Sequence, residues 1–156
     1  MAQIHHRSRS ILTAVLLLGC LASQLRGQVE DLEFQNGLLA TYRDSETGEV
    51  TRVEDGLALN WQDRLPDARL SGDSFSARLQ GYVLIRSAGD YRFFLYTQGK
   101  VRLEINGEVM LEQARVEPGW VTSQSVELDF GWQPLEIHFQ KTAPSARLGV
   151  FWSGPT

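Results

Sequence analysis

Apolar side chains alternate with polar ones over most of the chain that follows Gly37. The alternation appears in seven short runs, at residues 57–61, 75–80, 91–95, 100–105, 126–130, 135–139 and 146–152. Successive side chains of a β-strand point to opposite faces, so a period of two is typical of strands that bury one face. No stretch after Gly37 keeps the i, i+3, i+4, i+7 spacing of an amphipathic helix. The pattern therefore predicts an all-β fold.

Turn-forming residues separate these runs. Asn106-Gly107 is the clearest hairpin signal, because a type I′ turn needs positive φ at both central residues. Pairs that contain glycine at 89–90, 99–100, 118–119 and 131–132 divide the rest of the chain. Many short strands separated by turns predict a single antiparallel β-sandwich or barrel.

The four tryptophans fall into two groups. Trp61 and Trp152 are in phase with apolar neighbours, which predicts that both lie in the core. Trp120 and Trp132 stand beside glycine and proline, so we expect them in turns. An exposed indole there can stack on a sugar ring, and the alternative is that each folds over an end of the sandwich as a lid.

The first 22 residues have the features of an export signal. Residues 1–10 carry Arg7 and Arg9 and no acid, and the apolar run ILTAVLLL follows at 11–18. This run is shorter than the roughly 20 residues that span a bilayer. Residues 1–22 are therefore expected to be a signal peptide and residues 23–34 a tether.

Two ways of cleaving this leader stay open. Small residues before position 23 suit release of a free chain after Ala22, whereas Leu17-Leu18-Gly19-Cys20 resembles a bacterial lipobox, in which Cys20 would carry lipid. Either way the chain is expected outside the cytoplasm, in an extracellular, periplasmic or envelope-attached location. Contact with a membrane would come only through a lipid on Cys20.

Composition narrows the function classes. The 156 residues carry a net charge of −4, whereas nucleic-acid-binding domains carry a basic patch, so we expect no nucleic-acid partner. A single cysteine allows neither an internal disulfide nor a cysteine-based zinc site. The length after the leader suits one domain, which we place at residues 35–154.

Three motifs carry a resemblance to a known family. They are F-S-x-R-x-x-G at 75–81, G-x-Y-x-F at 89–93 and R-L-x-I-N-G at 102–107. In this order and spacing they resemble the protective-antigen domain family (PA-14), and the resemblance covers nearly all of residues 35–154. It implies a β-sandwich or barrel that serves as a non-catalytic extracellular module. Carbohydrate binding is the activity most often ascribed to such modules.

The resemblance also implies where a ligand would lie. Sugar-binding adhesin members hold calcium with two consecutive aspartates in the loop before the R-L-x-I hairpin. Here that loop reads Thr97-Gln98-Gly99-Lys100, so Gln98 and Gly99 replace the acids and Lys100 adds a positive charge. Calcium needs several oxygen ligands, so no metal or other cofactor is expected. A ligand is expected at Thr97–Lys100, with Asn106 and Trp120 beside it.

Two clusters of ionisable residues are candidates for catalysis or metal binding. His138 and Glu136 could act as a base and its orienting carboxylate, but a solvated strand face is the expected interpretation, and no catalytic residue is expected. Three carboxylates fall within residues 44–49, at a spacing that differs from a calcium-binding EF-hand loop. A solvated acidic turn is expected there.

Two functional hypotheses remain. The first is an exported, non-catalytic binding module for glycan or another cell-surface polymer. The alternative is a structural or protein-interaction domain with an envelope protein as partner, of the kind found at the N-terminus of larger bacterial envelope proteins.

Overall fold

The computed structural model describes residues 36–46 and 48–155. The expected signal peptide, tether and Cys20 lie outside the described residues. Nine strands occur within the described part: β1 (Leu38–Asp44), β2 (Glu49–Glu54), β3 (Ala58–Gln62), β4 (Phe75–Ile85), β5 (Gly89–Ile105), β6 (Glu108–Thr122), β7 (Val126–Leu128), β8 (Gly131–Gln140) and β9 (Ala146–Ser153). Every pairing between them is antiparallel, which confirms the predicted all-β class. Nowhere in this part is there a helix that could cross a bilayer.

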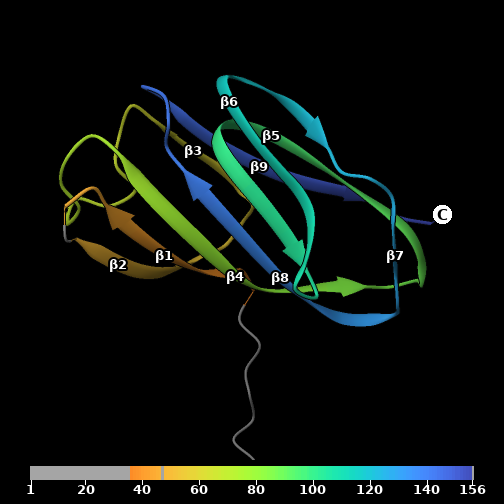
Figure 1. Ribbon diagram of the computed structural model, residues 1–156. Helices are drawn as coiled ribbons and strands as arrows, with labels where there is room; N and C mark the ends of the chain where they lie inside the picture. Colours follow the sequence, from red (N-terminus) through yellow and green to blue (C-terminus); the bar gives the residue numbers. More distant parts are fainter. Residues whose placement is uncertain (1–35, 47, 156) are drawn as a thin grey trace, which may run out of the picture. The chain divides into compact units, whose positions relative to one another are not determined.

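The long strand β5 organises the sheet, whose order is β2-β1-β4-β8-β5-β9-β3, with β6 and β7 also paired to β5. Residues 92–98 of β5 pair with β9, whereas residues 100–105 pair with β8. The sheet thereby divides into a β4–β8 half and a β3–β9 half, with β3 and β9 drawn behind the others (Figure 1). The core fills the space between the halves.

Gly99 lies where β5 changes its neighbour. The register with β6 shifts between Thr97 and Gly99, and Gly99 has a φ of 133°. A Cβ at this position would stand 2.5 Å from Cζ of Phe139, so any larger residue would collide with the core. Glycine thus allows the bulge and the close packing that turn β5 from one half into the other.

Aromatic rings fill the middle of the core. Trp61 on β3 lies 5.1 Å from Phe75 on β4 and 5.0 Å from Phe139 on β8, measured between ring centroids. Tyr42 packs against Trp61, and its hydroxyl donates to Glu54 Oε1 at 2.5 Å. The prediction that Trp61 belongs to the core is confirmed, since only 7% of it is exposed.

Two aromatic residues that fit the alternating apolar pattern are nevertheless exposed. Trp152 was predicted in the core, but 44% of it is exposed, because it lies near the end of β9, where its ring is 6.4 Å from that of Phe93, between centroids. Phe130 was assigned to an alternating run, but β7 ends at Leu128 and the chain turns before β8, which leaves 72% of Phe130 in solvent.

The turn predictions had mixed outcomes. The Asn106-Gly107 hairpin is confirmed, since both residues have positive φ and Ile105 pairs with Glu108 across it. The predicted turns at 99–100 and 118–119 are wrong, because the two pairs of residues lie inside strands β5 and β6.

Strand β6 contains a wide bulge. Residues 116–118 of β6 stand opposite Gln98 alone, between the pairs Thr97–Gly119 and Gly99–Arg115. β6 pairs only with β5, and such an edge position tolerates Pro118.

Candidate functional site

A row of four residues crosses the outer face of the β3–β9 half. In register, Trp120 on β6 pairs with Tyr96 on β5, Tyr96 with Gly149 on β9, and Gly149 with Ala58 on β3. Paired residues of neighbouring strands share a face. The neighbouring residues in sequence, such as Leu95 and Leu148, are buried, so this row faces outward.

Large and small side chains in this row produce a small hollow. Gly149 and Ala58, which have little or no side chain, form its floor, whereas Tyr96, Trp120 and Phe151 form an aromatic wall. The Trp120 ring lies 5.2 Å from Tyr96 and 5.6 Å from Phe151, between centroids. The cavity measures about 270 Å³, slightly below the roughly 300 Å³ at which pockets for drug-sized ligands begin. We call it the aromatic hollow.

Polar groups border the aromatic hollow on one side. Arg147 pairs with Gln98 on β5 and with Asn60 on β3, one row along from Gly149. Arg147 and Asn60 both line the cavity. An apolar pocket with a few convergent polar groups is the usual composition of a small-ligand site.

The predicted ligand loop at Thr97–Lys100 is not a loop, because these residues lie inside β5 at its bulge. Thr97 is fully buried and its hydroxyl donates to the Arg147 carbonyl at 3.2 Å. Gly99 is buried against Phe139. Gln98 points outward next to Arg147, and its Nε2 donates to the Val116 carbonyl at 2.9 Å.

The remaining predicted contacts lie apart from the aromatic hollow. Lys100 belongs to the other half, where its Nζ is 3.1 Å from Glu112 Oε1. Asn106 stands at the β5–β6 hairpin and its side-chain amide donates to Gln133 Oε1 at 2.7 Å. It is ten residues along β5 from Tyr96, a distance of up to about 30 Å. Of the predicted residues, only Trp120 therefore lines the aromatic hollow, and Gln98 lies next to its border residue Arg147.

Trp120 and Trp132 are on strands, which corrects their placement in turns. Both are exposed, Trp120 at 58% and Trp132 at 54%. Trp120 belongs to β6 and Trp132 to β8, where Trp132 pairs with Leu84 on the β4–β8 half. Trp120 thus lies in the aromatic hollow and Trp132 on a different face.

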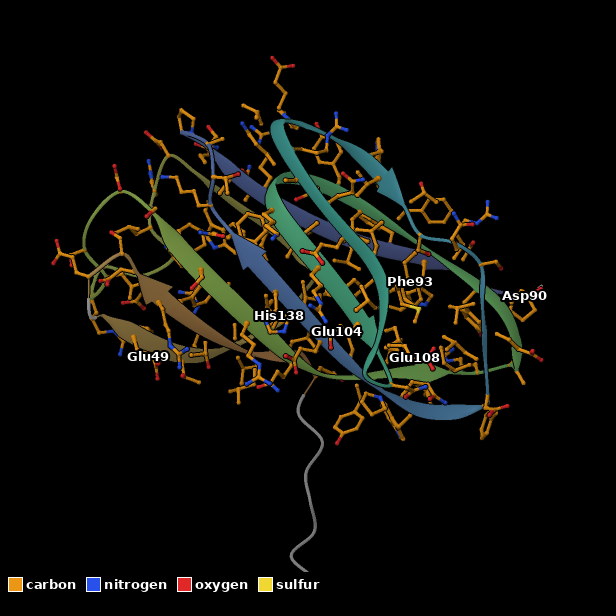
Figure 2. All side chains as sticks on the ribbon, in the orientation of Figure 1. Glu49, Asp90, Phe93, Glu104, Glu108 and His138 are labelled. Carbon is orange, nitrogen blue, oxygen red and sulfur yellow. The ribbon has the colours of Figure 1, made fainter. Side chains whose placement is uncertain are left out.

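His138 lines a polar depression of about 780 Å³ on the β4–β8 half, and Glu136 lies beside it. Figure 2 labels His138 on β8 and Glu104 on the neighbouring β5. Glu136 accepts two hydrogen bonds from Arg78, at 2.8 and 3.0 Å, and lies 2.6 Å from His138 Nε2. The hydrogen bonds from Arg78, above all, lower the pKa of Glu136.

The other charges of this depression are also paired. The ion pairs are Arg43–Glu49, Lys100–Glu112 and Arg102–Glu104. His138 and Glu136 lie on a polar strand face, as expected. The acids and bases of this face neutralise one another, and the Glu136 carboxylate is shared between Arg78 and His138.

The acidic turn at residues 44–49 is organised around Asp44. Its carboxylate accepts hydrogen bonds from the backbone amides of Glu46, Gly48 and Ser71, at 2.8–2.9 Å. These bonds, with that from the Ser71 amide the largest contribution, lower the pKa of Asp44. No cluster of acids, histidines or cysteines suited to a metal ion occurs among the described residues. The carboxylate therefore closes a turn, as expected.

Comparison with known proteins gives consistent results. The sequence profile of the PA14 domain matches residues 34–133. Anti-sigma-I factor RsgI3 of Acetivibrio thermocellus is 28% identical over 106 residues, which are 67% of this chain and 16% of that protein. The chain therefore spans about a sixth of that relative.

Two solved structures share the fold at low sequence identity. An anti-sigma factor domain-containing protein has a TM-score of 0.70 at 20% identity, over 78% of this chain and 44% of that one. A PA14 sugar-binding domain from an RTX adhesin has a TM-score of 0.63 at 16% identity, over 78% of this chain and 91% of that one. Such similarity establishes the architecture, and function has to be argued from the site.

Proposed function

We propose that this chain, which belongs to the PA14 domain family, is a non-catalytic carbohydrate-binding module that holds its ligand in the aromatic hollow. The observation that carries the proposal is the row Trp120–Tyr96–Gly149–Ala58. It places a broad apolar surface beside a depression with hydrogen-bonding groups at its border. The adhesin domain with the same architecture is described as sugar-binding, which supports this class of ligand.

The chemistry of the aromatic hollow suits a sugar ring. The axial hydrogens of a pyranose give it an apolar face that can lie on an indole, while its hydroxyls need polar partners at the edge. Trp120 would supply the stacking surface, with Asn60 and Arg147 as hydrogen-bonding partners. Because the hollow is shallow and a polymer loses freedom on binding, dissociation constants from about millimolar to tens of micromolar are expected.

Calcium has no part in this proposal. Gln98 donates to the Val116 carbonyl, and Gly99 is packed against Phe139, so neither could present a carboxylate as the adhesin aspartates do. The proposed site therefore differs from the calcium-dependent arrangement that the family resemblance implies.

A pair of tryptophan variants tests the proposal. Trp120→Ala should abolish retention on immobilised glycans, whereas Trp132→Ala should not, although it removes an equally large and equally exposed indole from the β4–β8 half. Thermal melts of both variants would check folding. Equal binding by the two variants would contradict a site at Trp120.

The alternative, a protein-interaction domain, has an observation of its own. Tyr82 and Leu84 on β4 and Trp132 on β8 are all exposed, and Leu84 pairs with Trp132. Exposed apolar side chains grouped in this way are typical of protein contacts. If pull-downs recover a protein partner that Trp132→Ala loses, while glycan arrays stay blank, this alternative replaces carbohydrate binding.

We also propose that the chain is exported, as its first 22 residues predict. Intact-mass measurement after expression in an exporting host should show the loss of about 2 kDa, or a lipid mass on Cys20. A product that keeps Met1 would contradict export.

A further inference from the structure

We propose that the aromatic hollow selects acidic glycans, because Arg147 would bind the carboxylate of a uronic-acid-type sugar. The inference rests on the proposed carbohydrate binding at the same hollow and names the class of sugar. It depends on a positive charge, that of Arg147, to which residues 36–46 and 48–155 give no partner.

Arg147 differs from the other shielded cations. Four described cations are buried or half-buried: Arg52, Arg115, Lys141 and Arg147. The first forms an ion pair with Glu54, and the next two donate to backbone carbonyls. The Arg147 guanidinium has no ion pair or hydrogen-bond acceptor among the described residues, and its Nε is buried without an acceptor.

An unpaired charge in this position is costly. Removing a cation from water without giving it an acceptor is unfavourable, and a buried N–H without a partner adds to that cost. Arg78, Lys100 and Arg102 on the β4–β8 half each lie beside a carboxylate. An anionic group bound next to Arg147 would provide what the protein itself does not.

The surroundings of Arg147 favour a carboxylate. A guanidinium presents its donors in a planar fork that matches the two oxygens of a carboxylate. The aromatic side chains beside it lower the local dielectric, which strengthens such an ion pair. None of the described residues that line the aromatic hollow is an acid, so a bound anion would meet no carboxylate among them although the chain as a whole is acidic.

The geometry also lets one sugar use both features. Arg147 is two residues from Gly149 on β9, and therefore on the same face. A ring stacked on Trp120 above Gly149 would direct one edge toward the Arg147–Asn60 border. A carboxylate on that edge would meet the guanidinium, while a neighbouring hydroxyl could accept from the Asn60 amide.

Matched polymers test the charge alone. Binding is measured by calorimetry with polygalacturonate and its methyl ester, and with carboxymethylcellulose and hydroxyethylcellulose, in low and physiological salt. We expect at least one acidic polymer to bind about tenfold more tightly than its uncharged counterpart. This preference should decrease as salt rises.

Variants assign that preference to one side chain. Arg147→Gln should bind the acidic and uncharged polymers equally, at the affinity of the uncharged one. Arg86→Gln removes the same charge from an exposed position after β4 and should keep the wild-type preference. Melting temperatures close to the wild type would show that both variants are folded.

The outcomes separate the two proposals. If the wild type binds the acidic and the uncharged polymer of each pair equally, and Trp120→Ala binds neither, the preference for acids is overturned. The proposed carbohydrate binding then stands. A preference that survives Arg147→Gln would overturn the role proposed for Arg147. Binding of neither kind of polymer, or binding that Trp120→Ala does not weaken, would overturn both.

Discussion

The indole of Trp61 lies 5.0 Å from the ring of Phe139, centroid to centroid, and so joins β3 to β8 across the core. The two strands belong to different halves of the sheet and are not hydrogen-bonded to each other. Side-chain packing alone holds them together at this point. The contribution of this contact to stability can therefore be measured without disturbing a strand pairing.

Trp61→Ala should lower the free energy of unfolding by about 3–5 kcal/mol, because it removes a buried aromatic side chain and leaves a cavity. Trp152→Ala should cost about 1 kcal/mol or less, since much of that ring is already in water. Urea denaturation followed by circular dichroism would give both values. An equal loss of unfolding free energy in the two variants would show that Trp152 contributes to the core as much as Trp61 does.

Gly149→Ala should weaken glycan binding while the domain stays folded. The added Cβ would lie 3.1 Å from Cε2 of Phe151 and 3.8 Å from Cβ of Tyr96, so it would raise the floor of the aromatic hollow and push the Phe151 ring. The ring is exposed and can move, which keeps the cost to stability small. Calorimetry and a thermal melt measure the two effects. Gly56→Ala, at a position with open space and no positive φ, serves as a control for binding.

Gly99→Asp should unfold or strongly destabilise the domain. A Cβ there would meet Phe139 Cζ at 2.5 Å and the Gln140 carbonyl at 2.7 Å, at a φ of 133° that favours glycine. Overpacking and backbone strain together should cost more than about 2 kcal/mol. Denaturant melts check this. An aspartate that is tolerated here, and that binds calcium, would contradict the packing described.

The wild-type domain should melt at the same temperature in millimolar Ca²⁺ and in chelator. Binding to the folded state raises stability by mass action, and the segment at 97–100 presents no carboxylate. A calcium-dependent rise in Tm that is lost in Asp44→Asn would instead place a cation at the acidic turn.

Asp44→Asn should remove part of the acid sensitivity of the fold. The pKa of Asp44 is lowered from its usual 3.8 in the folded protein, so its contribution is complete above the unfolded pKa and is lost as the pH falls through the folded one. The difference in Tm between wild type and variant should therefore be largest near pH 6 and should shrink toward pH 2. A difference that does not change with pH would show that the charge of Asp44 is irrelevant.

Sequence reasoning found most of the strands that bury one face, because burial imposes a period of two that local inspection can detect. It missed β1, where the exposed Leu39 between buried residues hides the alternation, and β2, which carries mostly polar residues. It also missed β6, which is an edge strand with both faces largely exposed and so has no such period. It also placed Gly99 and Gly119 in turns, since a glycine that allows a bulge looks the same in sequence as one that allows a turn.

The aromatic hollow was only partly predictable. Trp120 was identified as an exposed indole, and that much is a local property. Its partners Tyr96, Gly149 and Arg147 come from two other strands, and only the register between those strands brings them together. Alternation shows which way a side chain points along its own strand, but not which strand lies beside it.

The wide bulge in β6 has a consequence for how the molecule behaves in concentrated solution. A long, regular edge strand offers a template on which other chains can assemble into fibrils. Residues 116–118 stand opposite Gln98 alone and include a proline, so they divide the free edge of β6 into two short segments. Neither segment can support a long run of intermolecular pairing, so the bulge disfavours polymerisation through the edge of β6.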